Sequence, residues 1–205
     1  MKQVSIVIAS TLLFLTLSNC GGVPPTYYYK IDYEVTDAQH SGILPVTIGV
    51  GQFSADVLYE SDKIVYRDSP YEVQFYHYRR WIAQPKKIVA ERIFQQFRAA
   101  GLFQRVVRIP STFKIDYILR GRITSFEEWD EGQSWYGVVT IEFQLHTPDS
   151  NEVVWENVIS EKTAAAKKEP ADVVKAISES LNSVVAKSVA GISEHLKAQV
   201  SKSTI

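Results

Sequence analysis

Two segments of the chain carry apolar residues at the spacing of an amphipathic helix. In the first, Val89, Ile93 and Phe97 recur every four residues between Pro85 and Gly101. In the second, near the C-terminus, apolar residues recur at steps of three and four, at Ile177, Leu181, Val185, Val189, Ile192 and Leu196. The pattern predicts one helix over about residues 85–100 and a longer one of about 25 residues.

Most of the remaining chain consists of short segments rich in β-forming residues. Ile141, Phe143 and Leu145 alternate with polar residues, which places one strand face on a core and the other in water. Similar segments predict strands at 27–33, 44–50, 63–67, 71–78, 102–109, 115–124, 137–146 and 152–160, with Asp68-Ser69-Pro70 turning the third into the fourth. We therefore predict an α+β domain with a mainly antiparallel sheet and two helices on one face.

The N-terminus has the pattern of an export signal. A short positive start at Met1-Lys2 precedes an uncharged, mostly apolar run over residues 4–17. This run is too short to cross a bilayer comfortably, since a spanning helix needs about 20 apolar residues. Leu17-Ser18-Asn19-Cys20 resembles a bacterial lipobox, in which the cysteine is acylated after cleavage, although Asn19 departs from the usual small residue. The alternative is an ordinary signal peptide with Cys20 left as a free thiol.

These observations divide the chain into four parts: a cleaved lipoprotein signal peptide (1–19), a lipidated tether (20–26), the α+β domain (27–200) and a tail (201–205). The tether after Cys20 reaches only about 20 Å, so the domain is expected close to its membrane. Two or three acyl chains make such anchoring stable. Gly21, in place of an Asp that would resemble an inner-membrane retention signal, favours the periplasmic face of the outer membrane.

Composition and charge exclude several function classes. The 205 residues hold 22 basic and 23 acidic side chains, which leaves no broad positive field for nucleic acid. Neither the four histidines nor the single cysteine shows metal-ligand spacing. The acidic run at 127–131 lacks the alternating oxygen ligands of a calcium loop, so we expect a solvent-exposed connection between strands there. We therefore expect no cofactor, no metal and no catalytic residues.

Aromatic residues are concentrated on the segment 63–81. They fill strand positions and core, or they form a surface for a partner protein, since Tyr and Trp are enriched at interfaces. Alternation places Tyr76 and Tyr78 on the face opposite Tyr71, and two helices cannot cover both faces. Tyr76, Tyr78 and Tyr66 are thus the candidate partner surface, whereas Trp81 is expected in the core.

The same segment carries a family resemblance. Lys63-Ile64-Val65-Tyr66-Arg67, the hairpin, and Tyr78-Arg79-Arg80-Trp81-Ile82-Ala83-Gln84-Pro85 before the helix resemble the ABC-type transport auxiliary lipoprotein family, with Gln84 where the family more typically has Glu. The lipobox and helical C-terminus extend the resemblance over nearly the whole chain.

The resemblance implies a non-enzymatic lipoprotein in the outer membrane. Such a protein assists an MCE-domain protein and an ABC permease and ATPase in lipid transport between membranes. A homo-oligomer is compatible with the sequence. The alternative is an envelope scaffold or regulatory lipoprotein of another machine, such as a secretion pore or a peptidoglycan synthase. The short tether disfavours an activator of distant wall enzymes, and an enzyme is the weakest reading.

Overall fold

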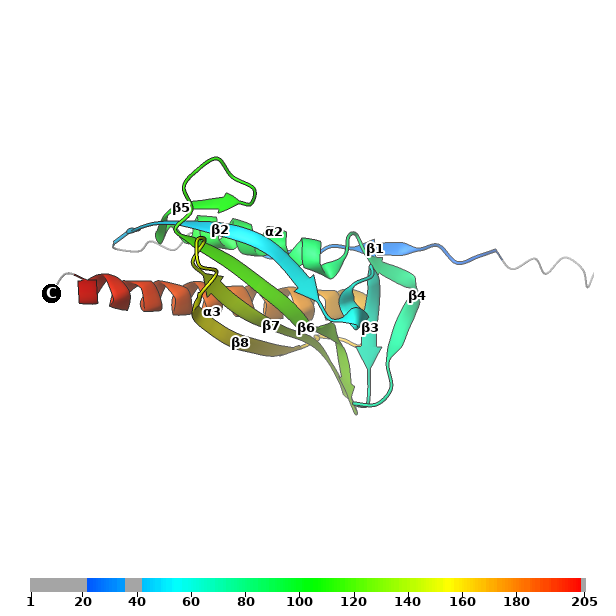
Figure 1. Cartoon of the computed structure of the whole chain (residues 1–205). Coiled ribbons are helices and arrows are strands. Elements are labelled where there is room, and N and C mark those ends of the chain that lie inside the picture. The colour runs from blue at the N-terminus through cyan, green and yellow to red at the C-terminus, as the bar shows by residue number, and fades with distance from the viewer. Residues whose placement is uncertain (1–21, 36–41, 204–205) are drawn as a thin grey trace, which may run out of the picture.

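The computed structural model describes residues 22–35 and 42–203. Its elements follow the chain in the order β1 (Tyr27–Tyr29), β2 (Leu44–Ala55), the 3-10 turn η2 (Val57–Tyr59), β3 (Lys63–Arg67), β4 (Gln74–Trp81), α2 (Pro85–Ala99), β5 (Phe103–Arg108), β6 (Tyr117–Glu131), β7 (Ser134–His146), β8 (Val153–Ala164) and α3 (Pro170–Ser203). They form a single α+β domain in which a sheet lies against two helices (Figure 1).

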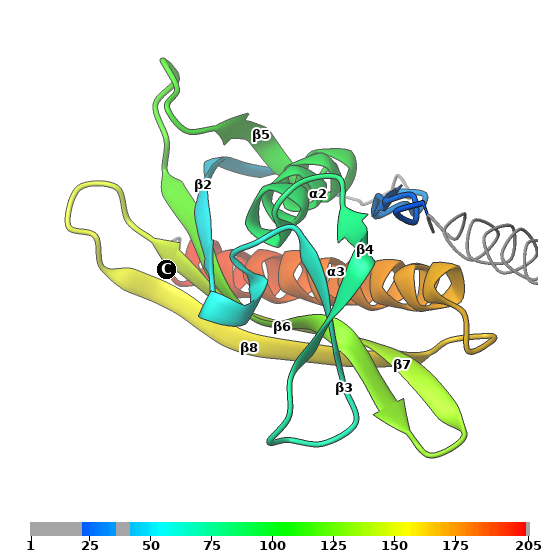
Figure 2. The same cartoon turned by 90° about the vertical axis from the view of Figure 1, so that its right-hand side faces the viewer.

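The sheet is organised around β6. One edge of β6 pairs with β7 in antiparallel fashion along its whole length, and β7 pairs likewise with β8. The other edge pairs in parallel with β2 near the start of β6 and with β3 near its end. β5 extends the sheet beyond β2, while β4 and then β1 extend it beyond β3 (Figure 2). The eight-stranded sheet is therefore mixed, and its longest pairings are antiparallel, as expected.

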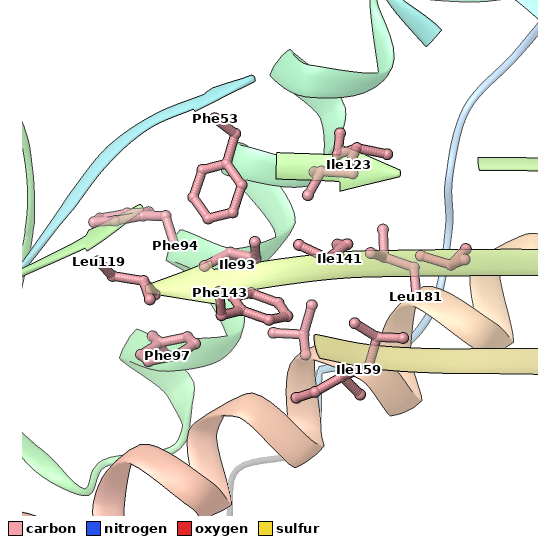
Figure 3. Packing of buried hydrophobic residues seen from close by; sticks show 14 of the residues in the cluster. Phe53, Ile93, Phe94, Phe97, Leu119, Ile123, Ile141, Phe143, Ile159 and Leu181 are labelled. Atoms are coloured by element: carbon pink, nitrogen blue, oxygen red, sulfur yellow. The ribbon is translucent and has the colours of Figure 1, made fainter. Parts of the chain in front are cut away.

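The core lies between the sheet and the two helices. α3 packs against β7 and β8, whereas α2 packs against β2 and β5. The apolar stripe that predicted α2 is buried, because Val89, Ile93 and Phe97 are completely enclosed. Figure 3 shows Ile93 and Phe97 of α2 facing Leu119, Phe143 and other side chains of the central strands. Removing this surface from water is the main favourable contribution to folding.

α3 lies very close to β7 because a glycine faces it. A Cβ atom built on Gly137 would come within 2.2 Å of the backbone nitrogen of Ile177. Two hydrogen bonds support the contact, since the Ser180 hydroxyl donates to the Gly137 carbonyl at 2.8 Å and lies 2.8 Å from the Thr163 hydroxyl. The helix backbone therefore rests directly on the sheet at this point.

Several boundaries differ from the sequence-based expectation. α3 has 34 residues rather than about 25 and continues through Ser203, into the segment assigned to a tail. β1 is shorter than expected, since the chain leaves the sheet after Tyr29 to pass over the helices, where the Ile31 side chain is buried.

Among residues 22–35 and 42–203, no helix combines the length and the apolar character that crossing a membrane requires.

The acidic run was assigned wrongly. Residues 127–131 are not a solvated connection but the last third of β6, and Glu127 and Glu128 are buried. The run stays in the sheet because β3 pairs with it on one edge and β7 on the other. Both carboxyl groups then need partners, since burying an unpaired polar group costs free energy.

Candidate functional site

The hairpin β3–β4 carries the residues that the sequence singled out. Its connecting loop is closed by Ser69, whose hydroxyl accepts hydrogen bonds from the backbone N–H groups of Tyr71 (3.3 Å) and Glu72 (3.2 Å). Such a serine-closed turn is typical of the Asp-Ser-Pro sequence found here. The Tyr66 hydroxyl donates to the Gln74 side chain at 2.6 Å and joins the two strands above the loop.

The pairing of the two strands is interrupted, and the interruption opens a groove. Val65 pairs with Phe75, but Lys63 pairs with Arg80, so β4 uses five residue steps where β3 uses two. The extra residues of β4 form a bulge, and a bulge bends its strand locally. The resulting groove has a volume of about 390 Å³ and is lined by residues that include Tyr66, Tyr76 and Arg80.

The three candidate tyrosines are placed differently. Tyr78 is 41% exposed, and Tyr71 on the loop is 95% exposed. Tyr66 and Tyr76 are half-buried, with ring centroids 4.8 Å apart. Trp81 is 1% exposed and its ring packs 5.1 Å from that of Phe126, which confirms its assignment to the core. Tyr78 on β4 and Tyr71 on the connecting loop are therefore the exposed tyrosines of the hairpin, and the paired rings of Tyr66 and Tyr76 form its base.

A buried carboxyl group fixes this base to the centre of the sheet. The Tyr76 hydroxyl donates to the two carboxyl oxygens of Glu128, at 3.0 and 3.2 Å. Burial, and after it the charge of Asp130, raises the pKa of Glu128 to about 8. Burial also raises the pKa of Asp130 and of the Tyr76 hydroxyl. At neutral pH the Glu128 carboxyl is thus mainly protonated, which avoids an uncompensated buried charge.

The neighbouring carboxyl group of Glu127 is held on the other face of the strand. The Tyr59 hydroxyl donates to it at 2.7 Å, and Arg67 forms an ion pair with it. Arg67 also lies over the ring of Trp129, 5.1 Å from its centroid. Desolvation, followed by the adjacent Glu127 carboxylate, raises the pKa of Tyr59. These contacts connect η2 and β3 to β6 and give the hairpin a rigid base.

The sequence analysis missed the two buried glutamates, although a signal for Glu128 was present. Phe126, Glu128 and Asp130 recur at every second position, as residues on one strand face do. Their acidity argued for solvent, and only the pairing on both edges overrides it. Glu128 is 0% exposed, so it is out of reach of a substrate, and its chemistry here is structural.

Other predictions concern residues elsewhere. Cys20, the expected acylation site, lies outside the residues that the structure describes. Within residues 22–35 and 42–203, no three His, Cys, Asp or Glu side chains are grouped so that they could hold a metal ion. The hairpin surface is thus the candidate site for which the structure supplies geometry.

Comparison with solved structures shows the same fold in other proteins. A crystal structure from Xanthomonas campestris matches with a TM-score of 0.75 and 22% identity, covering 84% of this chain and 99% of that one. An uncharacterised protein matches with a TM-score of 0.65 and 13% identity over 82% and 99% of the two chains. A hypothetical protein from Chlamydia trachomatis matches with a TM-score of 0.53 and 6% identity over 76% and 99%.

Sequence comparison identifies the family. No protein of curated function matches the chain. The model of the family described as "ABC-type transport auxiliary lipoprotein component" matches residues 29–189, which include the hairpin, α2, the first part of α3 and every strand from β2 to β8. Since the match covers most of the chain, this protein belongs to the ABC-type transport auxiliary lipoprotein family.

Proposed function

We propose that this protein is a non-catalytic periplasmic lipoprotein of an MCE-type lipid transport system. It is acylated at Cys20, anchored in the outer membrane, and binds an MCE-domain protein that works with an ABC permease and ATPase. The family match over residues 29–189 is the observation that carries the proposal, because the family is one of auxiliary components of ABC-type transport. An auxiliary component acts by binding, which agrees with a role outside catalysis.

The β3–β4 hairpin is the surface that we assign to the partner. It carries the exposed rings of Tyr78 and Tyr71 and a groove lined in part by Tyr66 and Tyr76, and tyrosine is enriched among binding hot spots. Contacts of Tyr76 and Arg67 with the buried glutamates hold the hairpin in one position. A rigid surface binds more tightly because less conformational freedom is lost on association.

A pull-down with hairpin variants tests this assignment. Changing both Tyr78 and Tyr71 to Ala should weaken capture of the MCE-domain partner by at least about tenfold, if together they contribute 1.4 kcal/mol or more of binding energy. Their unfolding free energy should change by less than about 1 kcal/mol, because both side chains are exposed.

Two further variants serve as controls. Phe113→Ala removes an aromatic ring outside the hairpin whose exposure lies between those of Tyr78 and Tyr71, and it should leave capture unchanged. Trp81→Ala should instead lower the stability by about 3–5 kcal/mol, because its side chain is fully buried. Capture that survives in the double tyrosine variant would exclude the hairpin as the partner surface.

The membrane assignment has a test of its own. Gly21→Asp should move the protein from the outer-membrane to the inner-membrane fraction of a density gradient, because Asp after the acylated cysteine resembles a retention signal. Gly22→Asp places the same charge one residue further and should leave the protein in the outer membrane. Native protein in the inner-membrane fraction would reverse the proposed topology.

A further inference from the structure

A second groove lies between α2 and β2. It has a volume of about 460 Å³, within the range of small-molecule sites. Val50, Phe53, Ala90, Phe94 and Ile109 give it a mostly apolar lining. A hollow of about 510 Å³ shares Phe53 and Ile109 with it and continues the groove toward Pro110 and Ile118.

The groove exists because one strand is longer than its neighbour. The last pair between β2 and β5 joins Val50 to Arg108, whereas β2 continues to Ala55. Beyond Val50 the β2 edge has no strand beside it among the residues that the structure describes. α2 covers the space only in part, since its Ala90 offers a small side chain there. The sheet and the helix thus leave an elongated apolar groove.

Two positively charged side chains lie at one end of this groove. Lys86 and Lys87 lie in the first turn of α2, where the structure has no acidic side chain and the helix dipole adds further positive potential. Neither lysine forms an ion pair with any described residue.

Charge is balanced at the other end. Arg108 binds the Glu91 carboxylate at 2.7 and 2.8 Å and lies 3.6 Å above the centroid of the Phe94 ring. This contact holds the pKa of Glu91 below its usual value, so the carboxylate remains ionised beside the guanidinium. The groove is therefore cationic at the start of α2 and neutral at Arg108, with an apolar floor between these two ends.

The cationic end is the one nearest to the N-terminal segment. The Ile82 N–H donates to the Tyr29 carbonyl at 2.8 Å, which places the start of α2 beside β1. Figure 1 shows the N-terminal segment leaving the domain at this same end. From Cys20 to Tyr27 the chain spans at most about 25 Å. An acylated Cys20 would thus keep Lys86 and Lys87 near the membrane surface.

We propose that this groove binds one acyl chain of an anionic glycerophospholipid. The chain lies on the apolar floor, and the phosphate is held by Lys86 and Lys87. Three observations support the inference. The groove has a suitable size and an apolar lining, its unpaired lysines lie together at one end, and that end lies beside the N-terminal segment that would carry the anchor. The inference rests on the proposed lipid anchor, and it assigns to the domain itself a lipid site apart from the hairpin.

Site-specific photocrosslinking in cells tests the proposal with the full, anchored chain. The photoreactive residue p-benzoylphenylalanine replaces Gln52, an exposed residue of the groove, in cells labelled with ³²P-phosphate. Irradiation should attach ³²P-labelled phospholipid to the protein. The same residue at Val158, an exposed apolar position on β8 outside both hollows, reports chance contact with the bilayer and should give at least about fivefold less label.

The lysines are tested in the same assay. Lys86→Gln with Lys87→Gln should lower the label at position 52 at least threefold, whereas Lys167→Gln with Lys175→Gln, two exposed lysines elsewhere, should leave it unchanged. Absence of label at position 52, equal label at positions 52 and 158, or full label without Lys86 and Lys87 would overturn the proposal. A protein adduct at position 52 would make the groove a peptide site instead.

The outcome can be separated from that of the proposed function. Capture of the MCE-domain partner is measured in the same cells by the hairpin pull-down, and anchoring by membrane fractionation. Normal capture and fractionation without lipid label would remove the groove proposal alone. Loss of anchoring in the unmodified protein would instead remove the premise on which both proposals depend.

Discussion

Glu128 connects the hairpin to the sheet through a carboxyl group that solvent does not reach. In an unfolded chain a glutamate has a pKa of about 4.3. In the folded protein, burial and the nearby Asp130 raise this pKa to about 8. Between these two pH values the folded state binds more protons at this site than the unfolded state. The contribution of Glu128 to stability is therefore complete below about pH 4 and is lost as the pH rises through about 8.

The variant Glu128→Gln should flatten this pH dependence. Glutamine keeps the shape of the protonated carboxyl group and cannot ionise. The native protein should lose up to about 1.4 kcal/mol per pH unit from this group between pH 5 and pH 8, and the variant should lack this loss. Urea denaturation at several pH values measures the difference. Glu156→Gln, at an exposed position, should leave the slope as it is, and an unchanged slope in Glu128→Gln would contradict the assignment.

At the scale of elements, the contact between α3 and β7 determines how the layers fit. The absence of a side chain at Gly137 lets the backbone of α3 approach the strand directly, and Ser180 satisfies the Gly137 carbonyl from the helix side. Interiors as dense as this one transmit any added volume to the backbone. The position of the helix therefore depends on one missing methyl group.

Gly137→Ala should lower the free energy of unfolding by about 3 kcal/mol, because the added Cβ would overlap backbone atoms rather than a flexible side chain. Gly132→Ala is the matched control. Its Cβ would have open space, and its φ of +55° costs only about 1 kcal/mol for alanine. Thermal or urea unfolding of both variants makes the comparison. Equal losses would mean that α3 can shift away from β7 at little cost.

For the whole molecule, the proposed roles converge on one end. The hairpin, the start of α2 and β1 are neighbours there, since β4 pairs with β1 and its last residues lead into α2. An anchor on the N-terminal segment would hold this end toward the membrane. The opposite end, where α3 terminates, would then face away from it (Figure 1).

Cys20→Ser should abolish metabolic labelling of the protein with palmitate, because the serine hydroxyl cannot form the thioether that carries the lipid. Any protein exported without the lipid should fold normally, since the described core is built from residues beyond the tether. Ser18→Ala, a small-for-small change two positions earlier, should keep the label. Continued labelling of Cys20→Ser would show that the anchor lies elsewhere.

The sequence by itself determined the class of the fold, the two helices and most strands. Val89, Ile93 and Phe97 predicted α2 because helical spacing acts within one segment and needs no knowledge of its neighbours. The sequence also predicted that Trp81 lies in the core and that the strand face carrying Tyr78 is not covered by a helix. In the structure Trp81 is buried and Tyr78 is exposed.

Only the tertiary structure decided which groups are buried and which segments leave space between them. Glu127 and Glu128 lie inside because β3 and β7, distant in sequence, pair on both edges of β6. The groove beside α2 arises from the unequal ends of β2 and β5. Pairing, burial and the pKa of a carboxyl group depend on contacts between remote segments, whereas periodicity along one segment reports only which face turns inward.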